Sequence, residues 1–248
     1  MLRRCVTLLA VMVIPAALEA QSLAQRVASL GDGTLRLSFA ARAGVCGNGR
    51  GITIASDDDA EWESSCAPGP VRVSLRVSDG RVAAAHTYVG GRWRPGQGPT
   101  TDLGIVSSPR AAADLLVLAE QTRGDAEELV TAATLADSAV VWPGLLRIAR
   151  RTDLPLDTRR RAVFWLGQAA SEAAARGLDS LTADDREDLE IRKQAVFALS
   201  QRPAGEAVPA LIRIVRTSPR AELRRTALFW LAQSEDPRAL TLFEEILR

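Results

Sequence analysis

Few residues of this chain could carry catalytic chemistry. The sequence holds one histidine (His86), one tyrosine (Tyr88) and one lysine (Lys193). His86 lies in a strand-like segment with no cysteine, aspartate or serine at a spacing typical of a catalytic or metal site, so we interpret it as a packed or edge histidine. We therefore predict a chain without enzymatic activity, catalytic residues, bound metal or cofactor.

Two other segments invite a ligand-binding interpretation. Residues 44–51 are rich in glycine, but they match neither a phosphate-binding loop nor a dinucleotide fingerprint, and no helical pattern follows them. Residues 57–63 hold three aspartates and two glutamates, which could attract Ca²⁺. The ligand spacing of an EF-hand is absent there. We interpret residues 57–63 as a solvated acidic loop, with a calcium site as the alternative.

The first residues are typical of an export signal. Arg3 and Arg4 precede an apolar run over 6–18, and small residues follow it, which predicts a signal peptide at 1–20. The run is shorter than the roughly 20 residues that span a bilayer, and Pro15 interrupts it. We therefore expect a secreted or periplasmic protein of the bacterial cell envelope, with no membrane span in the mature chain.

Export also determines how we interpret the cysteines. Loss of Cys5 with the signal leaves Cys46 and Cys66, and an oxidising compartment favours their pairing. Closing a loop of about 20 residues stabilises a fold by about 3 kcal/mol in the chain-entropy model. Two cysteines and His86 cannot supply the four ligands of a structural zinc site. We predict a Cys46–Cys66 disulfide.

The charged residues are nearly balanced, which argues against nucleic acid as a partner. The chain contains 31 Lys and Arg residues against 30 Asp and Glu residues. The balance also holds separately within residues 21–106 and within the remainder of the chain. Proteins that bind phosphate backbones carry a clear excess of basic residues. We therefore do not expect nucleic acid to be the partner.

Residues 28–106 have the pattern of a small antiparallel β module. Apolar and polar residues alternate with the period of a half-buried strand. Asp79-Gly80 separates two such runs and indicates a hairpin, because its turn needs the positive φ that glycine tolerates. The predicted strands lie at 35–39, 52–54, 71–77, 81–89 and 103–106.

The C-terminal part of the sequence repeats itself. The segment 159–168 returns at 192–201 and again at 224–233, and the segment 142–150 returns at 208–216. These offsets agree with one unit of two helices that recurs about every 33 residues. The predicted helices lie at 125–137, 142–151, 157–170, 172–182, 189–201, 206–217, 221–233 and 237–247, after a capping helix at 109–124.

The repeated unit resembles the HEAT-repeat family, in particular the short variety that is also found in phycobilisome lyases. Glu190-Ile191-Arg192, followed by Ala195 and Leu199, fits the family pattern, and the pattern returns over 222–231. The resemblance implies an α-α solenoid over 109–248 that binds other proteins. Each helical pair of such a solenoid buries its apolar face against its neighbours. The expected fold class is α+β.

The arginines of the repeats divide into two sets. Arg159, Arg192 and Arg224 occupy the position where the family uses arginine structurally, which implies pairing with acidic residues at repeat junctions. Asp157, Glu190 and Glu222 lie near them in the sequence and could neutralise them, and an anion-binding strip is the functional alternative. The resemblance places the second helix of each pair on the concave side. The arginines of those helices form our candidate partner surface: Arg147, Arg150, Arg151, Arg213 and Arg216.

The recurring aromatic residues have two interpretations. Phe164, Phe197 and Phe229 return in register, and we predict that they pack in the core as a ladder. At the next position of each repeat, Trp165 and Trp230 bracket Ala198, and this alternation indicates packing between layers. An aromatic binding groove is the alternative.

These observations favour an exported, non-catalytic scaffold that binds proteins. One alternative is an enzyme accessory of the bilin lyase-like type. Another is a cell-wall- or sugar-binding β module carried on a helical spacer, with Trp62, Tyr88 and Trp93 available to stack on a sugar. The helix at 237–247 ends in apolar residues, which leaves self-association through it open.

Overall fold

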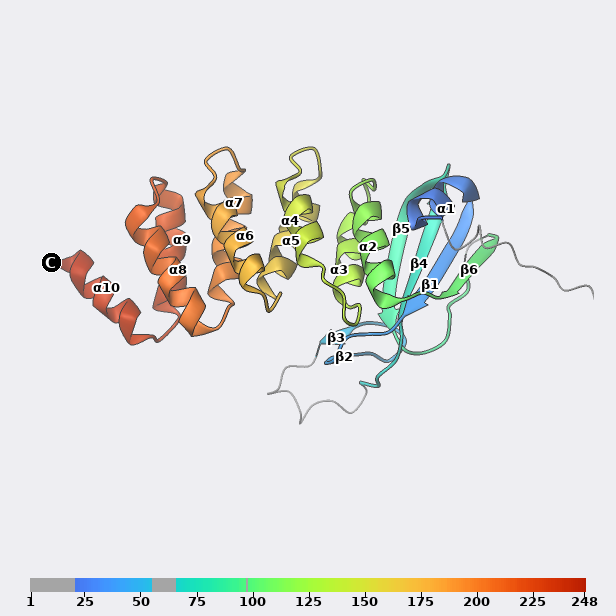
Figure 1. Ribbon diagram of the computed structural model, residues 1–248, viewed down its shortest axis with the longest axis horizontal. Coiled ribbons are helices and arrows are strands. Elements are labelled where there is room, and N and C mark those ends of the chain that lie inside the picture. The colour runs from blue at the N-terminus through green and yellow to red at the C-terminus, as the bar shows by residue number, and fades with distance from the viewer. Residues whose placement is uncertain (1–20, 55–65, 97) are drawn as a thin grey trace, which may run out of the picture.

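The computed structural model describes residues 21–54, 66–96 and 98–248. The expected signal peptide at 1–20 and the acidic segment 57–63, with the proposed calcium site and Trp62, lie outside the described residues. A small sheet is followed by a long stack of helices (Figure 1). The predicted α+β class, with helical repeats in the C-terminal part, is confirmed.

The main sheet has four strands in the order β5-β4-β1-β6. Its strands are β1 (Gly33–Phe39), β4 (Val71–Ser78), β5 (Arg81–Val89) and β6 (Thr100–Ile105). The predicted hairpin joins β4 to β5 in antiparallel pairing. Asp79 and Gly80 have φ angles of 52° and 67°. Both values lie in the left-handed region that a tight two-residue turn requires.

The sheet is mixed rather than wholly antiparallel, so this part of the prediction was wrong. Strand β6 pairs with β1 in parallel. The reason is the connection after β5, which crosses the polar face of the sheet instead of turning at its edge. Trp93 of this connection lies over the guanidinium groups of Arg36 and Arg72, each 4.9 Å from a ring centroid. Thr34 then donates its backbone N–H to Pro99 at 2.8 Å where β6 begins.

A second, two-stranded sheet carries the disulfide. It consists of β2 (Val45–Cys46) and β3 (Thr53–Ile54). Cys46 is bonded to Cys66 with a Cα–Cα distance of 5.3 Å, so the structure contains the bond that the sequence predicted. The bond joins β2 to the segment that leads into β4.

One short helix, α1 (Leu23–Leu30), was not predicted. Ser22 and Gln25 form a capping box in which each side chain accepts from the other residue's backbone N–H, at 3.3 and 3.0 Å. Leu23 and Val27 are buried, and the helix packs on α2 and β5. A single buried stripe of two turns is too short to show a clear helical period in the sequence.

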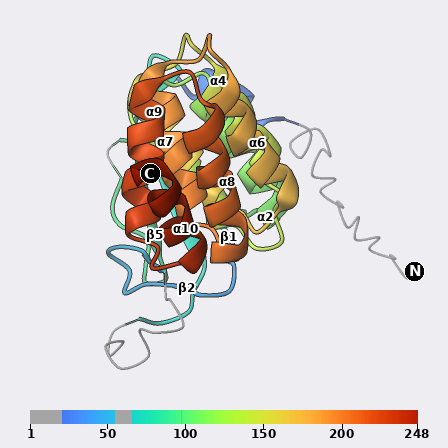
Figure 2. The same ribbon diagram turned by 90° about the vertical axis from the view of Figure 1, so that its left-hand side faces the viewer.

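The remaining helices form two layers. They are α2 (Ser108–Ala119), α3 (Ala126–Thr134), α4 (Trp142–Arg150), α5 (Leu156–Gly167), α6 (Glu172–Ala183), α7 (Leu189–Ser200), α8 (Ala204–Thr217), α9 (Ala221–Ala232) and α10 (Pro237–Leu247). Each lies within a few residues of its predicted range. Viewed along the stack, α7 and α9 belong to one layer, and α2, α4, α6 and α8 to the other (Figure 2).

The sheet and the helices share one apolar core. Buried side chains continue from Leu35 of the sheet through Leu129 of α3 to Leu199 of α7 and beyond. The edge strand β5 also donates two backbone N–H groups to α3, from Ala85 and Thr87 to carboxylates of the helix's first turn at 3.1 and 2.9 Å. The sheet therefore closes the N-terminal end of the stack, where a repeat protein needs a cap.

Candidate partner-binding surfaces

Two of the three repeated arginines, Arg159 and Arg192, are buried, and the half-buried Arg224 donates to the carbonyls of Ser218 and Pro219 after α8. Arg159 is 4% exposed, and its Nε donates to the carbonyl of Ala149 at the end of α4 (2.8 Å). Arg192 is 2% exposed and binds Thr182 at the end of α6 in the same way (3.1 Å). The last carbonyls of a helix have no partner within it and carry partial negative charge. These arginines therefore cap helix ends, a structural role.

The acidic partners of these two arginines lie at a junction between repeats, as the resemblance implied. Arg159 pairs with the buried carboxylate of Glu187, and Arg192 pairs with Asp185 at 2.8 Å. Both acids lie in the connection between α6 and α7. The nearby acid Glu190 instead binds Lys193 at 2.9 Å, because residues two positions apart on a helix point to different sides.

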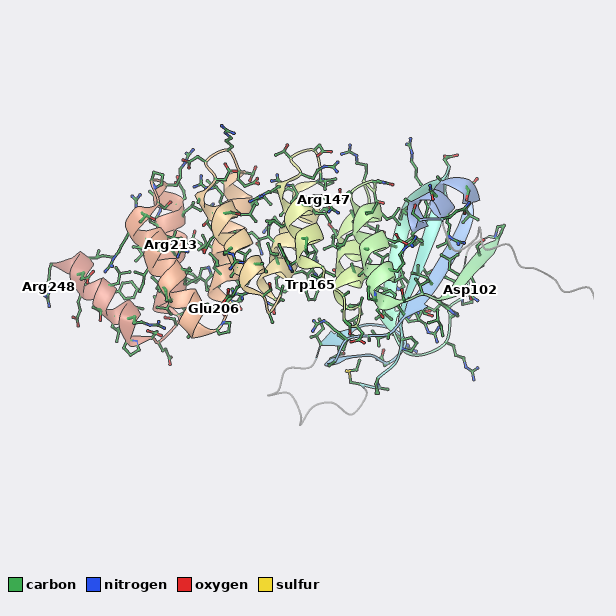
Figure 3. The ribbon with its side chains drawn as sticks, in the orientation of Figure 1. Asp102, Arg147, Trp165, Glu206, Arg213 and Arg248 are labelled. Carbon is green, nitrogen blue, oxygen red and sulfur yellow. A yellow bond between two sulfur atoms is a disulfide. The ribbon has the colours of Figure 1, made fainter. Side chains whose placement is uncertain are left out.

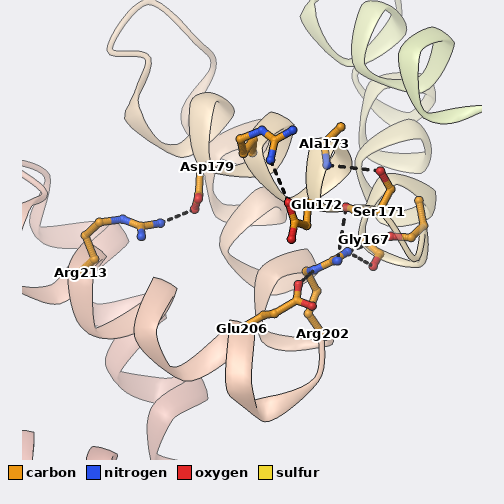
Figure 4. Close-up of polar contacts among 10 residues, drawn as sticks. Gly167, Ser171, Glu172, Ala173, Asp179, Arg202, Glu206 and Arg213 are labelled. Atoms are coloured by element: carbon orange, nitrogen blue, oxygen red, sulfur yellow. Dashed lines mark hydrogen bonds and ion pairs between the residues drawn. The ribbon is translucent and has the colours of Figure 1, made fainter.

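Arg202 is a buried arginine that no pattern in the sequence distinguishes. Its guanidinium donates to the carbonyls of Gly167 (3.4 Å), which ends α5, and of Ala169 (2.8 Å) and Ser171 (3.4 Å), which follow it (Figure 4). Its Nε binds Glu206 at 2.7 Å. The position does not recur as arginine in the neighbouring repeats, so no periodic signal could have found it.

The predicted partner surface lies on the even-numbered layer, and its arginines connect neighbouring helices. Arg147 of α4 binds Glu120 after α2 at 2.7 Å. Arg216 of α8 binds Glu245 of α10 at 2.6 Å. Figure 3 shows Arg147 and Arg213 on these helices. The surface is therefore brought together as a row, and its cations are matched by acids.

The other three arginines of this surface also bind nearby side chains. Arg213 of α8 pairs with Asp179 of α6, and Arg150 of α4 donates to the Ser180 hydroxyl at 2.6 Å. Arg151 pairs with Asp153 at 2.6 Å. The hydrogen bond from Arg151 is the main cause that lowers the pKa of Asp153 to about 2. Exposed pairs of this kind contribute little stability each. Within the described residues, four of the five arginines have a carboxylate partner, and Arg150 has a hydroxyl.

The predicted phenylalanine ladder is not a core ladder. Phe164 and Phe197 are half-buried, and Phe229 is 56% exposed. Phe197 contacts Trp230 of the next odd helix with ring centroids 5.1 Å apart. The Trp165 side chain, at the position equivalent to Trp230, is buried. Phe197 is thus covered by the following repeat, and within the described residues no further odd-numbered helix follows α9 to cover Phe229.

A pocket lies where the sheet region meets the solenoid. We name it the junction pocket; its volume is about 450 Å³. Three segments line it: the turn after β1, the connection between α3 and α4, and the end of α5. The side chains that line it include Arg42, Val140, Val141, Trp142, Trp165 and Gln168. Figure 3 shows Trp165 at the end of α5 nearest to β2 and β3.

The sequence did not reveal the junction pocket. Arg42 and Trp142 are 100 positions apart in the sequence; Arg42 belongs to no motif, and Trp142 was noted only as the first residue of a repeated segment. They meet because Arg42 and Ala40 form backbone hydrogen bonds to the residues that follow α3, at 2.8 and 3.0 Å. Such a strand-like contact outside the repeats leaves no signal in composition or period.

His86 and the two described aromatic residues considered for sugar stacking make contacts within the chain. His86 Nε2 lies 3.3 Å from Arg94, on the polar face of the sheet. Tyr88 is 1% exposed, and its hydroxyl accepts from the backbone N–H of Arg94 and donates to Arg92. Trp93 is packed on two arginines. Two of the three aromatic residues proposed for sugar stacking are therefore engaged within the chain, and the third, Trp62, lies outside the described residues.

The residues that the structure describes contain neither a metal-binding cluster nor a membrane-spanning helix. Among the described residues, no group of three His, Cys, Asp or Glu side chains could hold a metal ion. Within that part, no helix has the length and hydropathy needed to cross a bilayer.

Comparison with known proteins identifies the repeats. A search of curated proteins found no match to the chain. The family of HEAT repeats matches residues 143–232, which run from the first turn of α4 to the end of α9. HEAT repeats are helical scaffolds for interaction with other proteins, and their stacked pairs present extended surfaces. Residues 143–232 in the C-terminal part of this chain therefore match HEAT repeats, as the resemblance of the repeated unit predicted.

Proposed function

We propose that this chain is an exported protein-binding scaffold of the bacterial cell envelope, without catalytic activity of its own. The observation that carries the proposal is the elongated stack from α2 to α10, which is closed at one end by the sheet (Figure 1). Its core is continuous, so the two helix layers remain as broad outer surfaces. Extended surfaces on a rigid stack are the usual means by which repeat proteins bind partners.

Two features support the export part of the proposal. Residues 1–20 have the composition of a signal peptide. The Cys46–Cys66 disulfide fits an oxidising compartment, because cytosolic thiols are kept reduced. The surface charge agrees with a protein partner, since the row of arginines on the even-numbered layer is matched by acids.

A second copy of the chain is a further partner that the structure supports. Leu240 and Leu247 of α10 are 62% and 87% exposed, and they share the C-terminal end of the stack with Phe229. Apolar side chains at the end of a solenoid favour contact with another apolar surface. The proposed contact is end to end, through α9 and α10.

Crosslinking in the intact envelope tests the scaffold function. The tagged chain is expressed with residues 1–20, crosslinked, and purified from the periplasmic and membrane fractions at low and high salt. We expect the chain in these fractions, with the disulfide formed and a defined partner protein recovered at both salt concentrations. The matched control is the same chain without residues 1–20, which should stay in the cytoplasm with free thiols. Recovery of the full chain from the cytoplasm, or of no partner from the envelope, contradicts the proposal.

A further inference from the structure

The junction pocket has the size and lining of a site for one large apolar side chain. Its volume of about 450 Å³ lies within the range of small ligand sites. Trp142, Trp165, Val140 and Val141 provide an apolar lining. Val140 is 77% exposed at the rim, which leaves an apolar surface for a ligand to cover.

The charge of the pocket is of one sign. Among the described residues that line it, Arg42 is the only charged one. Its Nε donates to the carbonyl of Thr134 at 3.0 Å, and that is its one side-chain hydrogen bond within the described part of the chain. A guanidinium group has five N–H donors in a planar fork, so the terminal nitrogens of this half-buried side chain are available. Their matched acceptor is a carboxylate, which can bind both at once.

The pocket is held in shape before any ligand binds. The backbone of Arg42 donates to Leu135 at 2.8 Å, and Ala41 forms a β-bridge with Ala136. The indole N–H of Trp165 donates to the Thr131 hydroxyl at 3.4 Å. Two of the three lining segments are thus tied together by backbone contacts. A preformed site loses less entropy on binding than a flexible one.

We propose that the junction pocket binds an acidic segment of a partner protein that carries a large apolar side chain. The apolar side chain enters beside Trp142 and Trp165, and a neighbouring carboxylate pairs with Arg42. The inference rests on the proposed scaffold function and names the chemistry of its partner. It also explains why the sheet and the repeats occur together, because each supplies part of the site.

A blocked tetrapeptide, Glu-Leu-Glu-Glu, is the probe for this chemistry, and Gln-Leu-Gln-Gln is its neutral counterpart. The full chain is labelled with ¹⁵N, and the indole resonances of Trp142 and Trp165 are followed during titration. We expect both resonances to shift with the acidic peptide, and the neutral peptide to bind about tenfold more weakly. Residues 57–63 combine Trp62 with acids, so the titration is repeated on a Trp62→Ala chain to remove a competitor of the same chemistry.

Three variants make the test specific. Arg42→Gln should weaken binding of the acidic peptide by about tenfold and abolish its preference over the neutral one. Arg42→Lys should keep part of that preference, because the charge remains while the planar fork is lost. Arg161→Gln on α5 is the matched control, since this exposed arginine does not line the pocket and its loss should change nothing. Thermal unfolding checks that each variant is folded.

The outcomes separate this inference from the proposed function. If the indole resonances do not shift, or if Arg42→Gln binds both peptides as the original chain does, the inference is wrong. If the original chain and Arg42→Gln capture the same envelope partner equally, the scaffold function stands and the assignment of the pocket fails. Selective binding of the acidic peptide, together with loss of partner capture in Arg42→Gln alone, supports both.

Discussion

Arg159 and Glu187 form an ion pair between two consecutive helical pairs, and each of the two side chains is only 5% exposed. Arg159 belongs to α5, and Glu187 precedes α7 by two residues. The same guanidinium caps α4 through Ala149, so one side chain connects three successive parts of the stack. Because a buried charge without a partner is costly, removing either member should destabilise more than removing an exposed pair.

The first prediction concerns this pair. Replacing Glu187 by Ala leaves the Arg159 guanidinium buried without its counter-charge, and we expect the free energy of unfolding to fall by about 3 kcal/mol. The control is Asp157→Ala, whose exposed contact with Arg160 at 3.9 Å should cost less than about 0.5 kcal/mol. Urea unfolding of both variants measures the difference. Equal losses of unfolding free energy in the two variants would show that the buried pair stabilises the fold no more than the exposed contact does.

The repeats were predictable because their signal is local and recurs. Apolar positions of α5, α7 and α9 return about every 33 residues, so their helices, and the pairs that follow them, could be placed within a few residues. The partners of the buried arginines could not be predicted. Glu187 lies in an irregular connection 28 positions after Arg159, and no period relates the two.

Features that depend on the surroundings of an element could not be predicted from the sequence either. The direction of β6 follows from the path of the chain across the sheet, which the alternation of residues does not report. The exposure of Phe229 follows from what covers α9, although its register with Phe197 was clear. The junction pocket needs Arg42 and Trp142 to meet across two parts of the fold.

The second prediction tests the dependence of each phenylalanine on the next repeat. Phe197 is half-buried against Trp230, so Phe197→Ala should destabilise by about 2 kcal/mol, below the 3–5 kcal/mol of a fully buried ring. Phe229 is 56% exposed in the equivalent position, so Phe229→Ala should cost less than about 1 kcal/mol. Chemical denaturation of the dilute chain compares them. A larger loss of unfolding free energy in Phe229→Ala than in Phe197→Ala would mean that the Phe229 ring is covered in solution.

The third prediction concerns the disulfide. Reducing it, or replacing Cys46 and Cys66 together by Ser, frees a loop of about 20 residues in the unfolded chain and should lower the free energy of unfolding by about 3 kcal/mol. The effect should be larger for the sheet than for α7 and α9, which lie far along the stack (Figure 1). Hydrogen exchange of the oxidised and double-Ser chains measures both regions. Uniform loss of protection along the chain would indicate one cooperative unit instead.

The fourth prediction concerns acid. The hydrogen bond from Arg151 lowers the pKa of Asp153 from 3.8 to about 2, so the folded state holds this carboxylate ionised where the unfolded chain would be protonated. The stability that this interaction contributes is therefore present above pH 3.8 and is lost as the pH falls toward about 2. Carboxyl ¹³C NMR should show a midpoint near 2 for Asp153 and a higher one in Arg151→Gln. Asp236 is the internal control, because Arg238 holds its pKa at about 2 and Arg151→Gln should leave it unchanged.

The fifth prediction concerns the C-terminal end of the stack. If α9 and α10 meet a second copy, then Leu240→Glu and Leu247→Glu should keep the chain monomeric at concentrations where the original chain dimerises, because each places a charge in an apolar contact. Both leucines are exposed, so the melting temperature of the dilute variants should stay within a few degrees of the original, as for most surface substitutions. Sedimentation velocity over a range of concentrations separates monomer from dimer.

Val140→Glu is the matched control for this prediction. This valine is similarly exposed but lies in the junction pocket, so its change should leave self-association intact. A chain that stays monomeric at every concentration, or a dimer that persists with both leucines replaced, would exclude this end as the contact.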